Sequence, residues 1–156
     1  MSGNTEKKRS ILMSLVRVFA LLTIIAMVAY FFVLRPNMII MQQKSKRSEI
    51  PVTIKSIKTA LTYYHDMENK YISIDAYPKN PGAEAKPWKV EESGGFQTIG
   101  FSYDFGSVYG SYWVDASETD FTVYGISDID GDGVFATYTA TKNKDPELLN
   151  TDNDVF

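Results

Sequence analysis

The stretch DIDGDG places aspartates at alternate positions, Asp128, Asp130 and Asp132, and carboxylates at this spacing can hold a cation. An EF-hand calcium loop begins in this way, with a glycine in sixth place for the sharp turn. The twelfth place, where an EF-hand carries a bidentate glutamate, is Thr139. Because alternating, strand-like sequence lies on both sides of the stretch, the sequence excludes an EF-hand.

Two explanations of the aspartates remain. A β-hairpin with Asp-Gly turn chemistry accounts for the same residues without a metal. Three carboxylates this close also repel one another, and a hard cation such as calcium relieves the repulsion, so a weak calcium site is the second explanation. In that case Asp152 and Asp154, near the end of the chain, are candidates to complete the ligand shell. No other cofactor is expected.

Residues for catalysis are scarce. The chain has no cysteine and one histidine, His65, which excludes a thiol nucleophile, a zinc–thiolate site and a cluster of histidine ligands. His65 falls on a predicted helix and is expected to have a surface or packing role. Residues 131–136, GDGVFA, match the letters of a dinucleotide fingerprint, but that fingerprint needs a helix after it and alternating sequence follows instead. We therefore expect no enzymatic activity.

Charge is divided unevenly along the chain. The first 50 residues carry eight Lys and Arg and two Glu, whereas the remaining residues carry eight basic and seventeen acidic side chains. A basic, apolar front end joined to an acidic, aromatic back end is not the pattern of a nucleic-acid-binding protein. It predicts a membrane anchor followed by a water-soluble domain.

The anchor is the run VFALLTIIAMVAYFFVL, residues 18–34, which has no charge and lies between Arg17 and Arg35. Together with the apolar residues before it, the run reaches the roughly 20 residues that span a bilayer. The preceding residues EKKR predict a cytoplasmic N-terminus, although Arg35 and the lysines after it weaken that asymmetry. A cleaved secretory signal is the alternative, but RPNM follows the run where a small-residue cleavage site belongs. The sequence favours a retained anchor.

The helix is expected to continue beyond the membrane as an amphipathic helix over residues 36–76. Apolar residues recur there at helical spacing, which is typical of a helix packed on a sheet. Pro36 and Pro51 remove amide donors, so each should bend or open the helix locally. The apolar stripe consists of Ile54, Ile57, Leu61 and Tyr64, widened by Ala60, Met67 and Tyr71.

The second half of the chain has the pattern of a small sheet. Residues 77–95 are rich in Pro, Gly and charge and predict a loop. Four alternating aromatic and β-branched runs follow: FQTIGFSYDF, VYGSYWVD, FTVYGI and VFATYTAT. The tail after them has no period and is expected to close over a sheet edge. The predicted fold is α+β, with a basic segment 1–14, a transmembrane helix 15–35, the amphipathic helix 36–76, the loop, and an antiparallel sheet domain 96–156.

This order of elements resembles the type IV pilins and pseudopilins. The segment PNMIIMQQKSKRSEIPVTIKSIKTALTYYHDMENKY is similar to the helix of that family. FQTIGFSYDFG with VYGSYWV resembles the family's first hairpin, and FTVYGISDIDGDGVFATYTAT resembles its last. The resemblance implies a pilin-like fold and a role in filament assembly. The residues that take the family's helix positions are Pro36, Asn37, residues 44–49, Ile57, Ala60, Tyr63 and Tyr64.

Two positions depart from that family. Its leader ends in a glycine at which a prepilin peptidase cuts, and counting back from Pro36 places Ser14 there and Leu15 as the first residue of the cut chain. Its intramembrane glutamate pairs with a neighbour's terminal amine, because a bare ammonium in hydrocarbon is costly, and Phe19 stands in its place. Cleavage by the peptidase is therefore in doubt. The departures suit a minor subunit or a protein that stays outside the filament.

Two functions follow from the resemblance. The first is a structural subunit of a type IV pilus or a type II secretion-like filament, with other pilin-like subunits and the inner-membrane assembly platform as partners. The second is a permanently anchored envelope domain that has the pilin fold and binds a ligand or partner through its acidic, aromatic face. Both place a single span in the inner membrane and the C-terminal domain on the periplasmic or extracellular side.

Overall fold

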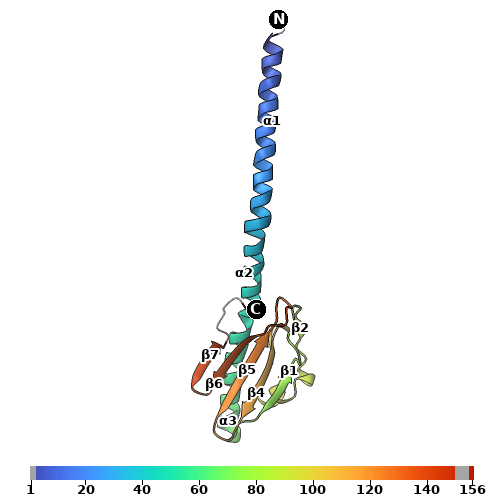
Figure 1. The fold of residues 1–156 in the computed structure, drawn as a ribbon. Helices are drawn as coiled ribbons and strands as arrows, with labels where there is room; N and C mark the ends of the chain where they lie inside the picture. The colour runs from blue at the N-terminus through green and yellow to red at the C-terminus, as the bar shows by residue number, and fades with distance from the viewer. Residues whose placement is uncertain (1–2, 150–154) are drawn as a thin grey trace. The chain divides into compact units, whose positions relative to one another are not determined.

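The computed structural model describes residues 3–149 and 155–156 (Figure 1). It forms two compact units, Met1–Gln42 and Gln43–Phe156. The first unit is helical, and the second contains helices and an antiparallel sheet. The predicted α+β fold class is confirmed.

A π-helical turn interrupts the helix of the first unit. Pro36 explains it, because this residue has no amide hydrogen to donate to the carbonyl four residues back. The N–H of Arg35 instead reaches the carbonyl of Tyr30, five residues back. The helix is therefore locally opened next to Pro36, as the sequence predicts. The elements are α1, Gly3–Ala29, the π turn η1, Tyr30–Leu34, and α2, Arg35–Arg47, which continues into the second unit.

The packed helix of the second unit is α3, Glu49–Glu68. Pro51 falls in its first turn, where a missing amide hydrogen leaves no helical bond unmade, and a turn at Ser48 separates it from α2. At its end, Asn69 adopts a left-handed backbone with φ of 55°, and its N–H bonds the carbonyl of His65. The prediction of a helix as far as residue 76 is therefore wrong, because this cap ends it at Glu68.

Five strands form one antiparallel sheet in the order β1-β4-β5-β6-β7, and β2 and β3 form a second, two-stranded sheet. The central strands pair in regular register, with Val114 opposite Val123 and Val123 opposite Ala140. The bounds are β1 Ile74–Tyr77, β2 Lys86–Pro87, β3 Ser107–Val108, β4 Ser111–Ala116, β5 Phe121–Ser127, β6 Ala136–Thr141 and β7 Lys144–Leu148, with a 3-10 turn η2 at Val90–Glu92 and a short helix α4 at Gly95–Thr98.

The sheet differs from the prediction at both edges. β1 lies where the helix was expected to continue, and β7 lies in the tail that was expected to have no strand. FQTIGFSYDF, predicted as part of the first hairpin, is instead α4 followed by an irregular segment. The aromatic residues of this stretch have another role, because Phe96 and Phe101 are buried and pack edge-on against Trp88.

The core of the second unit lies between α3 and the inner face of the sheet (Figure 1). The helix approaches β5 closely because Gly125 has no side chain, and a Cβ there would lie 2.9 Å from atoms of both Ile50 and Ile54. Met67, predicted to widen the stripe, is 76% exposed, so that part of the prediction is wrong. The centre of the stripe is confirmed, since the fully buried residues of α3 are Ile50, Ile54, Ile57 and Leu61.

Leu61→Ala should lower the free energy of unfolding by about 2–5 kcal/mol, because it leaves a cavity among fully buried residues. Denaturant unfolding of the full-length chain in detergent micelles, followed by tryptophan fluorescence, measures the change. Met67→Ala is the matched control on the same helix and should change stability by no more than about 0.5 kcal/mol. Equal losses in the two variants would contradict the packing that we assign to the stripe.

Candidate functional site

The first candidate site is the apolar surface of the helical unit. Every side chain from residue 11 to residue 42 is exposed, including Phe19 at 70% and Phe32 at 78%. The helical run Ile11–Glu68 contains a window long and apolar enough to cross a membrane, and none of that window is buried. A signal sequence near an N-terminus has the same properties. This surface needs a cover of lipid or protein, since so large an apolar area is unfavourable in water.

The four residues predicted to matter for processing and assembly all lie in this unit. Ser14, Leu15 and Phe19 follow one another on α1 within about two helical turns. Pro36 lies several turns further along, next to the π turn. The helix thus brings the first three together and leaves the fourth apart. All four side chains are exposed, and Phe19 offers no carboxylate to its surroundings.

The second candidate site is the acidic turn between β5 and β6. Carboxylate oxygens of Asp128, Asp130 and Asp132 lie within 4.8 Å of one another. Oδ1 of Asp128 is buried and has no hydrogen-bond partner within the described ranges, whereas Asp132 accepts a bond of 2.7 Å from the N–H of Val134. Both glycines of the turn have positive φ angles, 75° and 83°, which reverse the chain. The three carboxylates could bind a metal ion.

The end of the chain meets this turn. The N–H of Ile129 donates a hydrogen bond of 3.1 Å to the carbonyl of Phe156. Arg47, which is buried although charged, donates to the carbonyl of Val155 and lies with its guanidinium 5.3 Å from the centre of the Phe156 ring. The last two residues are therefore held between α2 and the acidic turn. The candidates to complete a metal shell, Asp152 and Asp154, lie outside the described residues.

A cluster around Glu49 was not predicted. Its carboxylate accepts hydrogen bonds from the Tyr109 N–H, at 3.1 and 3.2 Å, and from the Tyr112 hydroxyl, at 2.8 Å. Burial raises the pKa of Glu49, and these hydrogen bonds oppose the rise only in part. Burial and then the Glu49 charge raise the pKa of Tyr112 and of Tyr103. The cluster fixes the start of α3 to the connection between β3 and β4; the sequence signals it only by an acid directly before the buried stripe.

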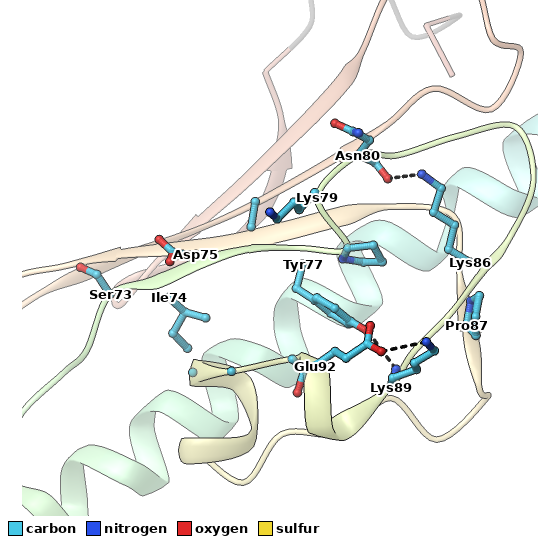
Figure 2. Close-up of a pocket in the computed structure, with 15 residues that line it drawn as sticks. Ser73, Ile74, Asp75, Tyr77, Lys79, Asn80, Lys86, Pro87, Lys89 and Glu92 are labelled. Carbon is cyan, nitrogen blue, oxygen red and sulfur yellow. Dashed lines mark hydrogen bonds and ion pairs between the residues drawn. The ribbon is translucent and has the colours of Figure 1, made fainter.

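A groove of about 760 Å³ runs beside β1 (Figure 2). The hydroxyl of Tyr77 accepts a hydrogen bond of 3.1 Å from the backbone N–H of Lys89, whose side chain pairs with Glu92 at 2.8 Å. Lys86 donates to the carbonyl of Asn80 at 2.9 Å. These interactions tie the loop after β1 together, so the polar groups that make them are already occupied.

His65 is the remaining residue that the sequence analysis considered. Its ring stacks on Tyr71, with ring centroids 4.3 Å apart and planes 20° apart. This contact is the packing role expected for it, and it ties the end of α3 to the segment before β1.

Comparison of the chain with protein families, with curated proteins and with solved structures finds no match. The fold by itself defines a pilin-like architecture, in which an apolar N-terminal helix is followed by a helix packed on an antiparallel sheet.

Glu49 should make stability depend on pH in one direction. Its pKa in the folded chain lies above the ordinary value of 4.5, so the folded state binds this proton more tightly than the unfolded state does. Its stabilising contribution is therefore complete below the unfolded pKa and is lost as pH rises through the folded pKa. Because Glu49→Gln cannot titrate, the stability of the variant minus that of the wild type should increase as pH rises from below the ordinary value of 4.5 through the folded pKa.

Denaturant unfolding of the full-length chain in micelles at a series of pH values measures this difference. The control is Glu118→Gln, which removes one carboxylate at an exposed position in the β4–β5 turn, away from the buried cluster. A difference for Glu49→Gln that rises no more than the difference for this control, or that falls with pH, would show that burial of Glu49 does not govern its titration.

Proposed function

We propose that this chain is a structural subunit of a type IV pilus or a type II secretion-like filament, anchored in the inner membrane with its sheet domain on the periplasmic side. Its partners are other pilin-like subunits and the inner-membrane assembly platform, and its role is assembly rather than catalysis. The observation that carries the proposal is an uncharged apolar run, residues 18–34, whose side chains are all exposed, followed in the same chain by a helix buried on an antiparallel sheet.

An apolar helix of this kind suits two environments in succession. Lipid covers it before assembly, and the apolar helices of neighbouring subunits cover it in a filament. Residues 18–34 carry no charge, so the transfer from lipid to protein leaves no unpaired charge buried in that run. Arg17, at one end of the run, can extend its charged group to the membrane surface.

The sheet is poorly suited to association through its edges. β1 has four residues, a register shift between Ile74 and Tyr77, and Pro78 directly after it. β7 contains Pro146 and pairs irregularly with β6. Short strands, bulges and prolines hinder the addition of a strand from another chain. These edge features favour association through the apolar helix.

Within this class, the residues at two positions favour a minor subunit. In the type IV pilins a peptidase cuts after a glycine, and Ser14 takes the place of that glycine here. Phe19 takes the place of the glutamate that neutralises a neighbour's terminal amine in that family. We therefore propose that the leader is retained and that the chain occupies few positions, such as a filament end. The same departures favour the second candidate, a permanently anchored binding domain that enters no filament.

A charge on the apolar helix should remove the chain from filaments, whereas a charge on the surface of the sheet unit should not. Leu22 is 58% exposed on α1, and Leu22→Lys places an ammonium in the run at a cost of about 2.5–3.5 kcal/mol in a membrane. Leu149→Lys is the control, since Leu149 is 54% exposed in the sheet unit. We expect wild type and Leu149→Lys in the filament fraction sheared from cells, and Leu22→Lys to be depleted from it.

Intact mass of the recovered chain completes this experiment. A full-length mass in the sheared fraction is expected, whereas a chain beginning at Leu15 would show that cleavage at Ser14 does occur. Recovery of the wild type from membranes alone, with none in sheared filaments, would contradict the filament proposal and leave the anchored binding domain.

For the acidic turn we propose a weak calcium site. It lacks a bidentate twelfth ligand, so affinity should fall at about 10⁻⁴–10⁻³ M, and calcium at about 100 times Kd should add about 2.7 kcal/mol to the free energy of unfolding. Thermal unfolding of the full-length chain with calcium, with magnesium and with chelator measures the effect. The rise should be specific to calcium, absent in Asp130→Asn and intact in Asp104→Asn. Equal unfolding midpoints in the three solutions would show that the aspartates form a turn and bind no calcium.

A further inference from the structure

The outer face of the sheet has a pocket beside Trp113. The register of β1 and β4 shifts between Ile74 and Tyr77, so that Asp75 and Ala76 together lie opposite this single residue. Bulges of this kind redirect side chains and are frequent next to binding sites. Here the bulge lies along a pocket of about 330 Å³ lined by residues 73–76 of the β1 side and 113–115 of β4.

Trp113 turns one ring face to this pocket. Its indole stacks on Tyr124 of β5, with ring centroids 4.9 Å apart and planes 5° apart, so Tyr124 covers the face on the β5 side. Because β4 lies between β1 and β5 in the sheet, the opposite indole face is turned towards β1 and the pocket. An indole whose second face is uncovered can attract a cation to that face through the quadrupole of the ring.

Two carboxylates flank that face. Asp115 lies two residues after Trp113 on β4, and therefore on the same side of the sheet. Figure 2 shows Asp75 and Ser73 on the side of β1 opposite to the buried Ile74. Asp75 and Asp115 are both exposed, and neither makes an ion pair within residues 3–149 and 155–156. A cation between them would therefore meet two uncompensated charges.

Ser73 holds the rim of the pocket in place. Its hydroxyl accepts a hydrogen bond of 3.0 Å from the N–H of Ala116 and donates one of 3.3 Å to the carbonyl of the same residue. This side chain extends the pairing of β1 and β4 past the last backbone pair. The pocket is thus bounded by fixed strands on both sides, which lowers the entropy lost when a ligand binds.

We propose that this pocket binds the guanidinium group of an arginine on a partner protein. A guanidinium is planar and cationic, so it can stack on the indole while its N–H groups donate to Asp75 and Asp115. The chain after residue 50 carries seventeen acidic and eight basic side chains, and this excess attracts a basic partner. The pocket lies on the sheet face opposite α3, so the proposal is independent of association through the apolar helix.

The test uses the full-length chain with ¹⁵N-labelled tryptophan in uncharged detergent micelles at low salt, titrated with the peptide acetyl-Gly-Gly-Arg-Gly-Gly-amide. The chain has two tryptophans, so the indole signal of buried Trp88 reports that the fold is intact, and Trp113→Phe assigns the other signal. A saturable shift of the Trp113 signal is expected. The same peptide with citrulline, which has a similar shape and no charge, should bind at least about tenfold more weakly.

A pair of double variants separates the pocket from the general charge of the domain. Asp75→Asn with Asp115→Asn should weaken binding of the arginine peptide by at least about tenfold. Asp104→Asn with Glu118→Gln makes the same change of net charge at two exposed positions elsewhere and should weaken binding by less than about twofold. Equal losses in the two double variants would overturn the proposal. So would an unmoved Trp113 signal, equal binding of the citrulline peptide, or tighter binding of a matched lysine peptide.

Discussion

The close approach of α3 to β5 is the constraint on which the sheet unit depends. Gly125 has no side chain, and a Cβ at this position would come within 2.9 Å of Ile50 and Ile54, so any larger residue would push the helix away from the strand. At the observed separation Glu49, the residue before Ile50, reaches the hydroxyl of Tyr112 at 2.8 Å. The hydrophobic seam and the polar cluster at its end therefore depend on the same missing side chain.

Sequence periodicity predicted the elements whose burial follows a regular pattern. Leu61 and the isoleucines before it recur at helical spacing because one side of α3 is buried, and β4, β5 and β6 alternate because one face of the sheet is buried. The prediction failed where another cause produced or hid the pattern. Phe96 on the short helix α4 and Phe101 just after it pack on Trp88 rather than on a strand. The left-handed Asn69 ends a helix whose apolar residues continue, and the polar sequence KDPEL forms an edge strand.

Whether a candidate site could be predicted from the sequence depended on how far apart its residues lie along the chain. Asp128, Asp130 and Asp132 are adjacent in sequence, so a turn was sufficient to predict that their carboxylates converge. Glu49 and Tyr112 are 63 positions apart, and no local pattern encodes their contact. No local pattern indicates the burial of Arg47 either, yet this residue is buried against Val155 and Phe156.

The two faces of the sheet have different consequences for function. The inner face packs against α3, and the core between them consists of residues of the second unit alone. The edges carry a bulge and prolines that hinder strand addition, so the sheet is poorly suited to forming a continuous structure with a neighbour. The outer face remains, with an aromatic stack and exposed carboxylates rather than a large apolar patch. Such a surface suits recognition by charge and stacking, which is reversible and specific.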